Sequence, residues 1–272
     1  MKTPCHALLN ARLLDPATKT DTIGGILIEN GHILDWGAHI KNDNLPDGAT
    51  SEDCRGHCLA PGLVDAHAYL CEPGKEHRET MATAGLAAAA GGITTINAFP
   101  QTEPVIDDPS LVEIVARRAR ETCPVNVCIT GALTKGLNGT EMAELGLLAE
   151  AGVVAFSDGQ KAIGDINLMR RVLAYSTMFD CPIIVHAEEP NLASSGVMTG
   201  GRTATFMGLK SIPSCAEAIL VERDIRLTAM TGAKWHAAHL STADALNSIR
   251  RAKNDQIQVT AGTAPHYHAL ND

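Results

Sequence analysis

Short apolar runs rich in β-branched residues recur along most of the chain and alternate with stretches of helical periodicity. Runs of this length, bounded by turn residues, are typical of buried strands. We expect strands at 63–70, 93–100, 125–133, 153–158, 182–188, 234–241 and 257–263. The segments between them, such as Ser110–Glu121 and Leu168–Phe179, are Ala-rich or Leu-periodic and are predicted to be helices.

This alternation of strand and helix, with polar residues where each strand ends, is typical of a parallel (β/α) barrel. In such a barrel the functional residues lie at the C-terminal ends of the strands. A doubly wound open sheet is the alternative, but no Gly-x-Gly-x-x-Gly motif follows the first predicted strand. We therefore predict an α/β fold in which residues 61–272 form a (β/α)8-type TIM barrel, with seven of its strands in this chain.

The first part of the chain has a different pattern and is predicted to form a small β-sandwich segment over residues 1–60. Apolar runs at Ala7–Leu14 and Gly25–Glu29 are followed by Asn30-Gly31, a strong signal for a hairpin turn. The run His32–Trp36 is the predicted returning strand.

Composition narrows the class of protein. The chain has 272 residues, 45% of them hydrophobic, which is enough for a sizeable core. Its net charge of −9 is spread without long runs of one sign, so we expect no nucleic-acid partner. We find no apolar run of transmembrane length and no signal-peptide pattern, so we expect a cytoplasmic protein that does not bind membranes. The eight cysteines lack a Cys-x-x-Cys framework, which favours reduced thiols.

One stretch carries the most specific signal: Pro61-Gly62-Leu63-Val64-Asp65-Ala66-His67-Ala68-Tyr69-Leu70-Cys71-Glu72-Pro73-Gly74. It resembles the first barrel strand of the amidohydrolase superfamily, in particular the dihydroorotase branch. That branch has the pattern Pro-Gly-Leu-Val-Asp-x-His-x-His-x-Arg-x-Pro-Gly. His67 matches the first histidine, whereas Tyr69 stands at the second histidine and Cys71 at the arginine.

Three later segments extend the resemblance over nearly the whole chain. Val153–Gly159 is similar to the branch's Phe-Ser-Asp-Asp-Gly motif and contains Asp158. Ile183–Glu189 contains His186 after an apolar run, and Trp235–Thr242 contains His239 in a His-x-x-His-x-Ser-Thr pattern. Taken alone, a lone histidine or a strand-end aspartate is more often structural than a ligand. The resemblance is what favours a functional role.

The resemblance implies a metal centre. Its residues in this chain would be His67, Asp158, His186 and His239, which supply the imidazole and carboxylate ligands that suit zinc. Because Tyr69 replaces the second histidine, we expect one zinc ion at most. Asp158, His186 and His239 would hold it, since three protein ligands plus water is the usual catalytic arrangement. His67 would lie nearby as a weak ligand or none.

The resemblance also implies positions that grip a substrate carboxylate. Cys71 stands where the branch has arginine, Gln101 where it has asparagine, and His266 lies in the loop after the seventh strand. A thiol cannot reproduce the planar two-donor fork of arginine. Glutamine keeps an amide but moves it by one methylene group. The predicted substrate site is therefore altered at two of its contacts.

Three functions remain open on this evidence. The first is an active dihydroorotase, which interconverts dihydroorotate and N-carbamoyl-aspartate in pyrimidine biosynthesis. The second is a non-catalytic pseudo-dihydroorotase that scaffolds aspartate transcarbamoylase. The third is a hydrolase of another cyclic amide. We favour a dihydroorotase-like hydrolase with impaired catalysis that binds a small-molecule substrate and forms a homo-oligomer. In the family, an eighth strand with a catalytic aspartate follows the segment that matches the end of this chain, and we expect it beyond Asp272.

Overall fold

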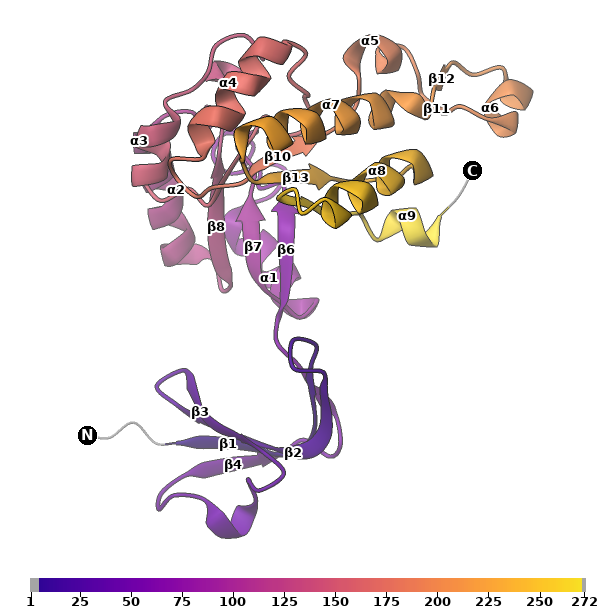
Figure 1. Cartoon of the computed structure of the whole chain (residues 1–272). Helices are drawn as coiled ribbons and strands as arrows, with labels where there is room; N and C mark the ends of the chain where they lie inside the picture. Colours follow the sequence, from indigo (N-terminus) through magenta and orange to yellow (C-terminus); the bar gives the residue numbers. More distant parts are fainter. Residues whose placement is uncertain (1–4, 271–272) are drawn as a thin grey trace. The chain divides into compact units, whose positions relative to one another are not determined.

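A computed structural model describes residues 5–270 and divides the chain into two compact units, Met1–Leu63 and Val64–Asp272 (Figure 1). The first unit is built around one five-stranded sheet, with strand order β3-β2-β1-β4 and β5 paired to β1. Its strands are β1 (His6–Asp15), β2 (Thr20–Glu29), β3 (His32–Gly37), β4 (Thr50–Asp53) and β5 (Cys58–Leu59). A short 3-10 helix, η1 (Asn42–Asn44), precedes β4.

The predicted hairpin in this unit is confirmed. Strands β2 and β3 pair antiparallel, and the turn residues Asn30 and Gly31 have φ values of 53° and 76°. Two consecutive positive φ values are the geometry for which Asn-Gly is favoured in tight hairpins. Along β1, Ala7 and Leu9 are buried on one face, where they pack with Leu27 and Ile40.

The second unit contains seven strands in one sheet, in the order β14-β13-β10-β9-β8-β7-β6, as the alternating pattern predicted. They are β6 (Leu63–Ala68), β7 (Ile93–Ala98), β8 (Asn126–Gly131), β9 (Ala155–Ser157), β10 (Ile183–His186), β13 (Trp235–Ala238) and β14 (Val259–Ala261). The pairs from β7 to β14 are parallel. Within the described residues, β6 and β14 are the two edges of this curled half-barrel sheet.

Helices separate the strands along the chain. They are α1 (Met81–Ala90), α2 (Pro109–Thr122), α3 (Leu145–Glu150), α4 (Ile166–Ser176), α7 (Cys215–Thr231) and α8 (Ala243–Asn254), with η2 (Lys135–Leu137) before α3. The segment between β10 and α7 contains α5 (Pro190–Ala193), β11 (Met198–Thr199), α6 (Arg202–Met207) and β12 (Ser211–Ile212). The last element is α9 (His266–Ala269). Among residues 5–270, no helix is long and apolar enough to cross a bilayer.

Side chains on the two faces of the sheet form two cores. Ile183 and Val185 of β10 and Trp235 of β13 belong to the large cluster that includes residues of α2, α4, α7 and α8. Alternate positions supply a smaller cluster on the other face, formed by Phe99, Ala155, Ile184 and Ala238. The period of two along β10 therefore places His186 on the same face as Ile184. This inner face is where the candidate site lies.

The loops after β6 and β7 cross at close range. Lys75 pairs with Glu103 at 2.8 Å, and the Glu103 backbone N–H donates to the Pro73 carbonyl at 3.1 Å. Gly74 lies at the crossing with φ +99°, and a Cβ atom there would be 2.1 Å from the Glu103 carbonyl oxygen. Only glycine fits this position, because both the backbone conformation and the space exclude a side chain. The crossing fixes the loops that carry Cys71 and Gln101.

We therefore expect Gly74→Ala to lower the free energy of unfolding by about 3 kcal/mol, as positive φ and overpacking act together. Gly92→Ala is the matched control, because Gly92 has φ +77° but nothing within 4 Å of an added Cβ. It should lose only about 1–2 kcal/mol. Urea denaturation of both variants measures the difference. Equal losses would show that the crossing at Gly74 has no steric cost.

Candidate active site

Three of the four predicted ligand residues come together at the C-terminal ends of their strands. His67 lies in β6, His186 ends β10 and His239 follows β13. The ring centroids of His67 and His239 are 4.1 Å apart, and those of His186 and His239 are 5.5 Å apart. His67 also stacks on Phe99, with centroids 3.5 Å apart. Strands β6 and β13 are not neighbours in the sheet, so the sheet must curl to bring their histidines into contact.

Burial and neighbouring histidines lower the pKa of two of these imidazoles, those of His67 and His239. Burial, with the nearby His239 and His186, lowers the pKa of His67 to about 3. Burial and then His186 also lower the pKa of His239. Within the described part of the chain, Nδ1 of His67 and Nδ1 of His186 are buried without a hydrogen-bond partner. Neutral imidazoles with unpaired nitrogen atoms are the form in which histidine binds a metal.

The chemistry of this donor set fits a divalent metal, but the geometry is not that of a closed site. Among residues 5–270, no group of three or more His, Cys, Asp or Glu side chains is arranged to hold one ion. The unpaired Nδ1 atoms of His67 and His186 are the observation in favour of a metal. The predicted ligand side chains would have to move before any three of them could bind the same ion.

Asp158, the fourth predicted ligand, has other partners. It follows β9 and is 2% exposed. Its Oδ1 accepts hydrogen bonds from the backbone N–H groups of Leu133 and Thr134 at 3.0 and 2.9 Å. Its Oδ2 accepts from the Thr134 hydroxyl at 2.5 Å. Burial raises the pKa of Asp158, and these hydrogen bonds oppose the rise. The carboxylate thus ties the end of β9 to the segment after β8.

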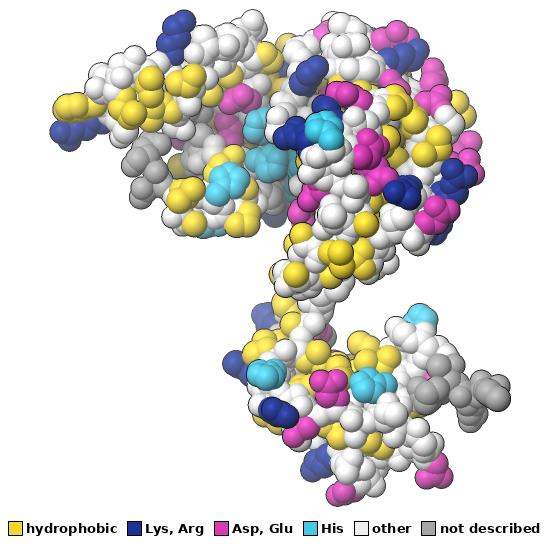
Figure 2. Space-filling view, turned by 180° about the vertical axis from the view of Figure 1, so that it is seen from behind, with side chains coloured by type: hydrophobic (Ala, Val, Ile, Leu, Met, Phe, Trp, Pro, Cys, Tyr) yellow, Lys and Arg dark blue, Asp and Glu magenta, His cyan; other side chains and the backbone are white. Residues whose placement is uncertain are grey.

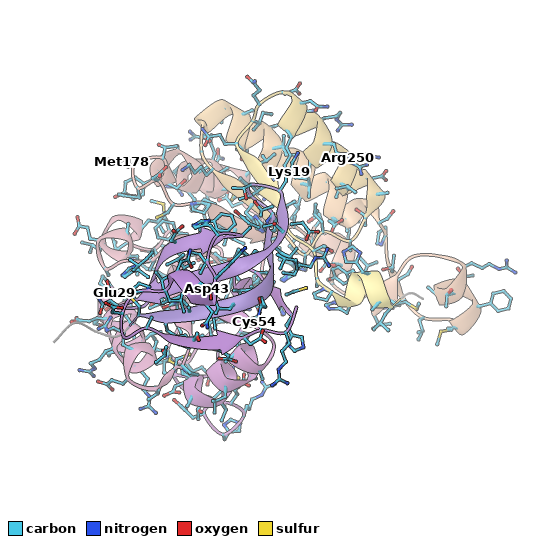
Figure 3. All side chains as sticks on the ribbon, turned by 90° about the horizontal axis from the view of Figure 1, so that it is seen from below. Lys19, Glu29, Asp43, Cys54, Met178 and Arg250 are labelled. Carbon is cyan, nitrogen blue, oxygen red and sulfur yellow. The ribbon has the colours of Figure 1, made fainter. Side chains whose placement is uncertain are left out.

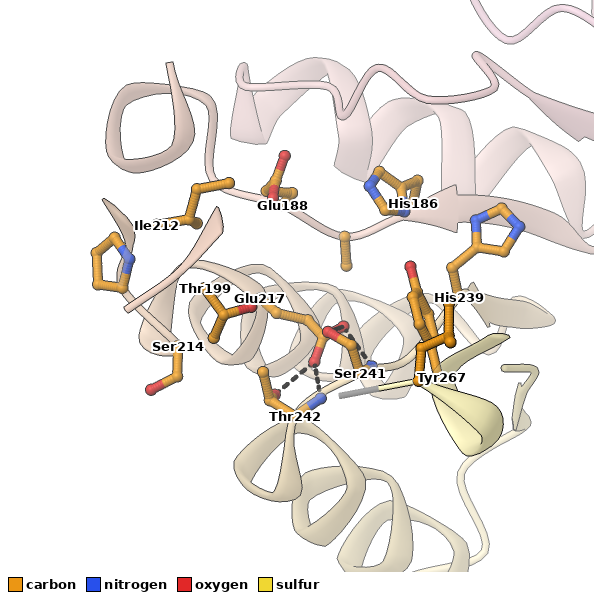
Figure 4. Close-up of a pocket in the computed structure, with 13 residues that line it drawn as sticks. His186, Glu188, Thr199, Ile212, Ser214, Glu217, His239, Ser241, Thr242 and Tyr267 are labelled. Atoms are coloured by element: carbon orange, nitrogen blue, oxygen red, sulfur yellow. Dashed lines mark hydrogen bonds between the residues drawn. The ribbon is translucent and has the colours of Figure 1, made fainter. Parts of the chain in front are cut away.

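Two neighbouring cavities are lined by predicted ligand residues, and only the first includes histidines. One, of about 370 Å³, is lined by His186, Glu188, Glu217, His239 and Tyr267 among others, and Figure 4 shows these side chains around it. The second, of about 390 Å³, is lined by Asp158, Lys161 and Glu188 among others. Glu188 lines both cavities, so the two lie next to each other. Asp158 therefore lines the second cavity, whereas His186 and His239 line the first.

The predicted substrate positions are spread around the site. Cys71 is 7% exposed, whereas Tyr69 is 40% exposed. Gln101 is half-buried, and its amide carbon lies 2.1 Å from where a Cβ on Gly159 would stand. The amide thus fills the space beside Gly159. His266 lies in α9 and makes an edge contact with Tyr267 at 4.4 Å. It is not among the residues that line either cavity near the histidines.

Side chains given no role from the sequence also shape the site. Phe99 supplies the stacking surface for His67, and Thr134 holds Asp158. Glu217 reaches from α7 to the residues that follow His239. Phe99 lies in the predicted strand 93–100, but its contact with His67 joins two segments far apart in the chain. Local sequence carries no signal for such contacts.

Histidines at the C-terminal strand ends of a parallel half-barrel define the class of (β/α)-barrel proteins whose active sites lie at that end. Residues 56–245 match the family described as Dihydro-orotase-like. The chain is 42% identical over 261 residues to the dihydroorotase of Endomicrobium trichonymphae, covering 96% of this chain and 60% of that protein. It is 44% identical over 260 residues to that of Acetivibrio thermocellus, covering 96% and 60%. The chain belongs to the dihydroorotase-like family, as its motifs predicted.

Solved structures support the fold. An L-hydantoinase (dihydropyrimidinase) from Arthrobacter aurescens superposes with a TM-score of 0.82 at 21% identity, covering 100% of this chain and 60% of that one. A D-hydantoinase superposes with a TM-score of 0.76 at 19% identity, covering 98% and 59%. The chain therefore spans about 60% of the length of the curated relatives named above.

The low pKa of His67 predicts a pH dependence for the metal-free protein. The folded state keeps His67 neutral down to about pH 3, whereas the unfolded chain takes up a proton below its ordinary value of 6.5. Stability is therefore lost as pH falls from 6.5 towards 3. His67→Gln lacks this group, so its urea midpoint should fall less than that of the wild type between pH 7.5 and 5.0 in chelator. Parallel pH profiles would contradict the assigned burial of His67.

Proposed function

We propose that this chain carries the catalytic histidines of a dihydroorotase-type hydrolase of pyrimidine biosynthesis. The reaction is the reversible hydrolysis of the cyclic amide of dihydroorotate to N-carbamoyl-aspartate. The observation that carries the proposal is the meeting of His67, His186 and His239 at the strand ends. Membership of the dihydroorotase-like family, and relatives named dihydroorotase, supply the reaction class.

A single zinc ion is the proposed cofactor, with Asp158, His186 and His239 as its ligands. When bound, zinc lowers the pKa of water and polarises a carbonyl group. The unpaired Nδ1 of His186 supports its role as a ligand. Asp158 would have to exchange its bonds to Thr134, so His67, with its own unpaired Nδ1, is the alternative third ligand.

We further propose that turnover of dihydroorotate is impaired. Cys71 and Gln101 stand where the family grips the substrate carboxylate, and Tyr69 stands at a ligand position. Losing a charge-assisted hydrogen bond costs about 1.5–3 kcal/mol of binding. Misplacing the substrate beside the reacting groups slows the chemical step as well. We also propose that the protein is cytoplasmic and forms a homo-oligomer.

The same substitutions favour a second candidate, a pseudo-dihydroorotase that scaffolds aspartate transcarbamoylase. Its support is the joint change at Tyr69, Cys71 and Gln101, which affects a ligand and two substrate contacts together. Against it stand the retained His67, His186 and His239, which meet at the strand ends in an arrangement that a pure scaffold does not need. Co-purification with the transcarbamoylase, together with absence of turnover, would favour the scaffold.

The metal proposal predicts one equivalent of zinc or fewer per chain after loading and desalting, measured by elemental analysis. His186→Ala should abolish binding, because it removes a ligand common to both candidate sets. His32→Ala, at an exposed histidine of the first unit, is the matched control and should bind as the wild type does. Asp158→Asn and His67→Gln then identify the third ligand. Two equivalents of zinc, or retention by His186→Ala, would refute the proposal.

The substrate proposal predicts that Tyr69→His, Cys71→Arg and Gln101→Asn, combined in the full-length protein, raise dihydroorotate turnover. The arginine supplies the two-donor guanidinium group that binds the substrate carboxylate. The shorter asparagine withdraws the amide that fills the space beside Gly159. The expected gain is at least about tenfold in kcat/KM, from one recovered charge-assisted contact. Cys71→Ser removes the thiol without adding a donor fork and should give no gain. Wild-type turnover at the rate of the named relatives would show that these substitutions are harmless.

A further inference from the structure

The turn that follows His239 is held by a carboxylate from another helix. Glu217, in the first turn of α7, accepts hydrogen bonds from two consecutive residues, Ser241 and Thr242 (Figure 4). Oε1 accepts from the Ser241 backbone N–H at 2.9 Å and from its hydroxyl at 3.2 Å. Oε2 accepts from the Thr242 backbone N–H at 2.8 Å and from its hydroxyl. Both oxygens of the carboxylate are thus used twice.

His239 itself has a backbone conformation that needs such support. Its φ is +58°, in the left-handed region that costs a non-glycine residue about 1–2 kcal/mol. A residue in this region persists only where the surrounding structure holds it there. Directly after His239, the Leu240 N–H donates to the Gly262 carbonyl at 2.9 Å. Glu217 then holds the two residues that follow Leu240.

The hydrogen-bonding pattern requires a carboxylate at position 217. Thr242 is the N-cap of α8, and its hydroxyl accepts from the Ala245 N–H at 3.4 Å while it donates to Glu217. All four groups that reach Glu217 are donors, so an amide in its place would present one acceptor and one mismatched donor. Negative charge beside the N-terminus of the 12-residue helix α8 is also favourable.

We infer that Glu217 is a positioning residue that fixes the imidazole of His239 in the active site. The competing explanation is that Glu217 only links helix α7 to helix α8 and has no effect on the His239 imidazole. Glu222 provides the comparison, because it lies on the same helix and also joins it to α8 through an ion pair with Arg251. It does so away from the turn after His239. If Glu217 only ties the helices, loss of either carboxylate should have similar effects.

The first test reads the imidazole directly and does not depend on catalysis. Long-range ¹H–¹⁵N spectra of the purified, histidine-labelled protein report each imidazole, and the His239 signal is assigned by its loss in His239→Gln. Glu217→Gln should shift or broaden the His239 signal and leave that of His6, in the first unit, in place. Glu222→Gln should change neither. A His239 signal identical to the wild type in folded Glu217→Gln would overturn the inference.

If Glu217→Gln does not fold, a milder variant tests the same inference. Thr242→Ala removes one donor to Glu217 and a helix cap, at a cost of about 1 kcal/mol. It should move the His239 signal in the same direction by a smaller amount. No movement in folded Thr242→Ala would also overturn the inference.

The catalytic consequence rests on the proposed function. With dihydroorotate, Glu217→Gln should lower kcat by about 10- to 100-fold, the range typical of outer supporting residues, with KM changed by less than about threefold. Glu222→Gln should retain the wild-type values. Absence of turnover in the wild type would count against the proposed function, whereas the His239 spectra would still decide the role of Glu217. Equal losses of kcat in the two variants would support a plain structural tie and overturn the inference.

Discussion

Parallel pairing of seven strands places their C-terminal ends at one edge of the sheet, and curling of the sheet brings His67 of β6 against His239, which follows β13. Small residues on the inner face, such as Ala155 and Ala238, leave room for this curl, while Phe99 and Ile184 fill the interior beneath the histidines. On the outer face, larger residues such as Trp235 bury against the helices. The candidate site exists only because these two cores hold the curvature.

Crowding of the imidazoles determines the chemistry of the site. Three histidines share a partly buried space, and burial together with the neighbouring histidines opposes protonation of His67 and His239. Neutral imidazoles can accept a proton or bind a metal. A protein that only scaffolds a partner needs neither ability. Acidic and basic side chains are exposed on the face that Figure 2 shows, and Figure 3 labels two exposed basic residues, Lys19 and Arg250.

Carboxylates around the site act mainly on the backbone. Asp158 binds the N–H groups of Leu133 and Thr134, and Glu217 binds those of Ser241 and Thr242. Each therefore fixes a loop at the end of a strand. Charge-assisted bonds to backbone N–H groups are stronger than neutral ones, which suits them to hold loops whose side chains take part in function.

The sequence by itself determined the succession of strands and helices, the Asn30-Gly31 hairpin and the histidines at the ends of β10 and β13, because each depends on local periodicity or on a short motif. It also indicated the family, through motifs spread along the chain. Only the tertiary structure decided that His67 contacts Phe99 and His239, that Asp158 pairs with Thr134, and that Glu217 holds the turn after His239. These contacts join residues far apart in the chain. Their partners depend on how the sheet curls and where each loop crosses, and periodicity along a single segment carries no information about either.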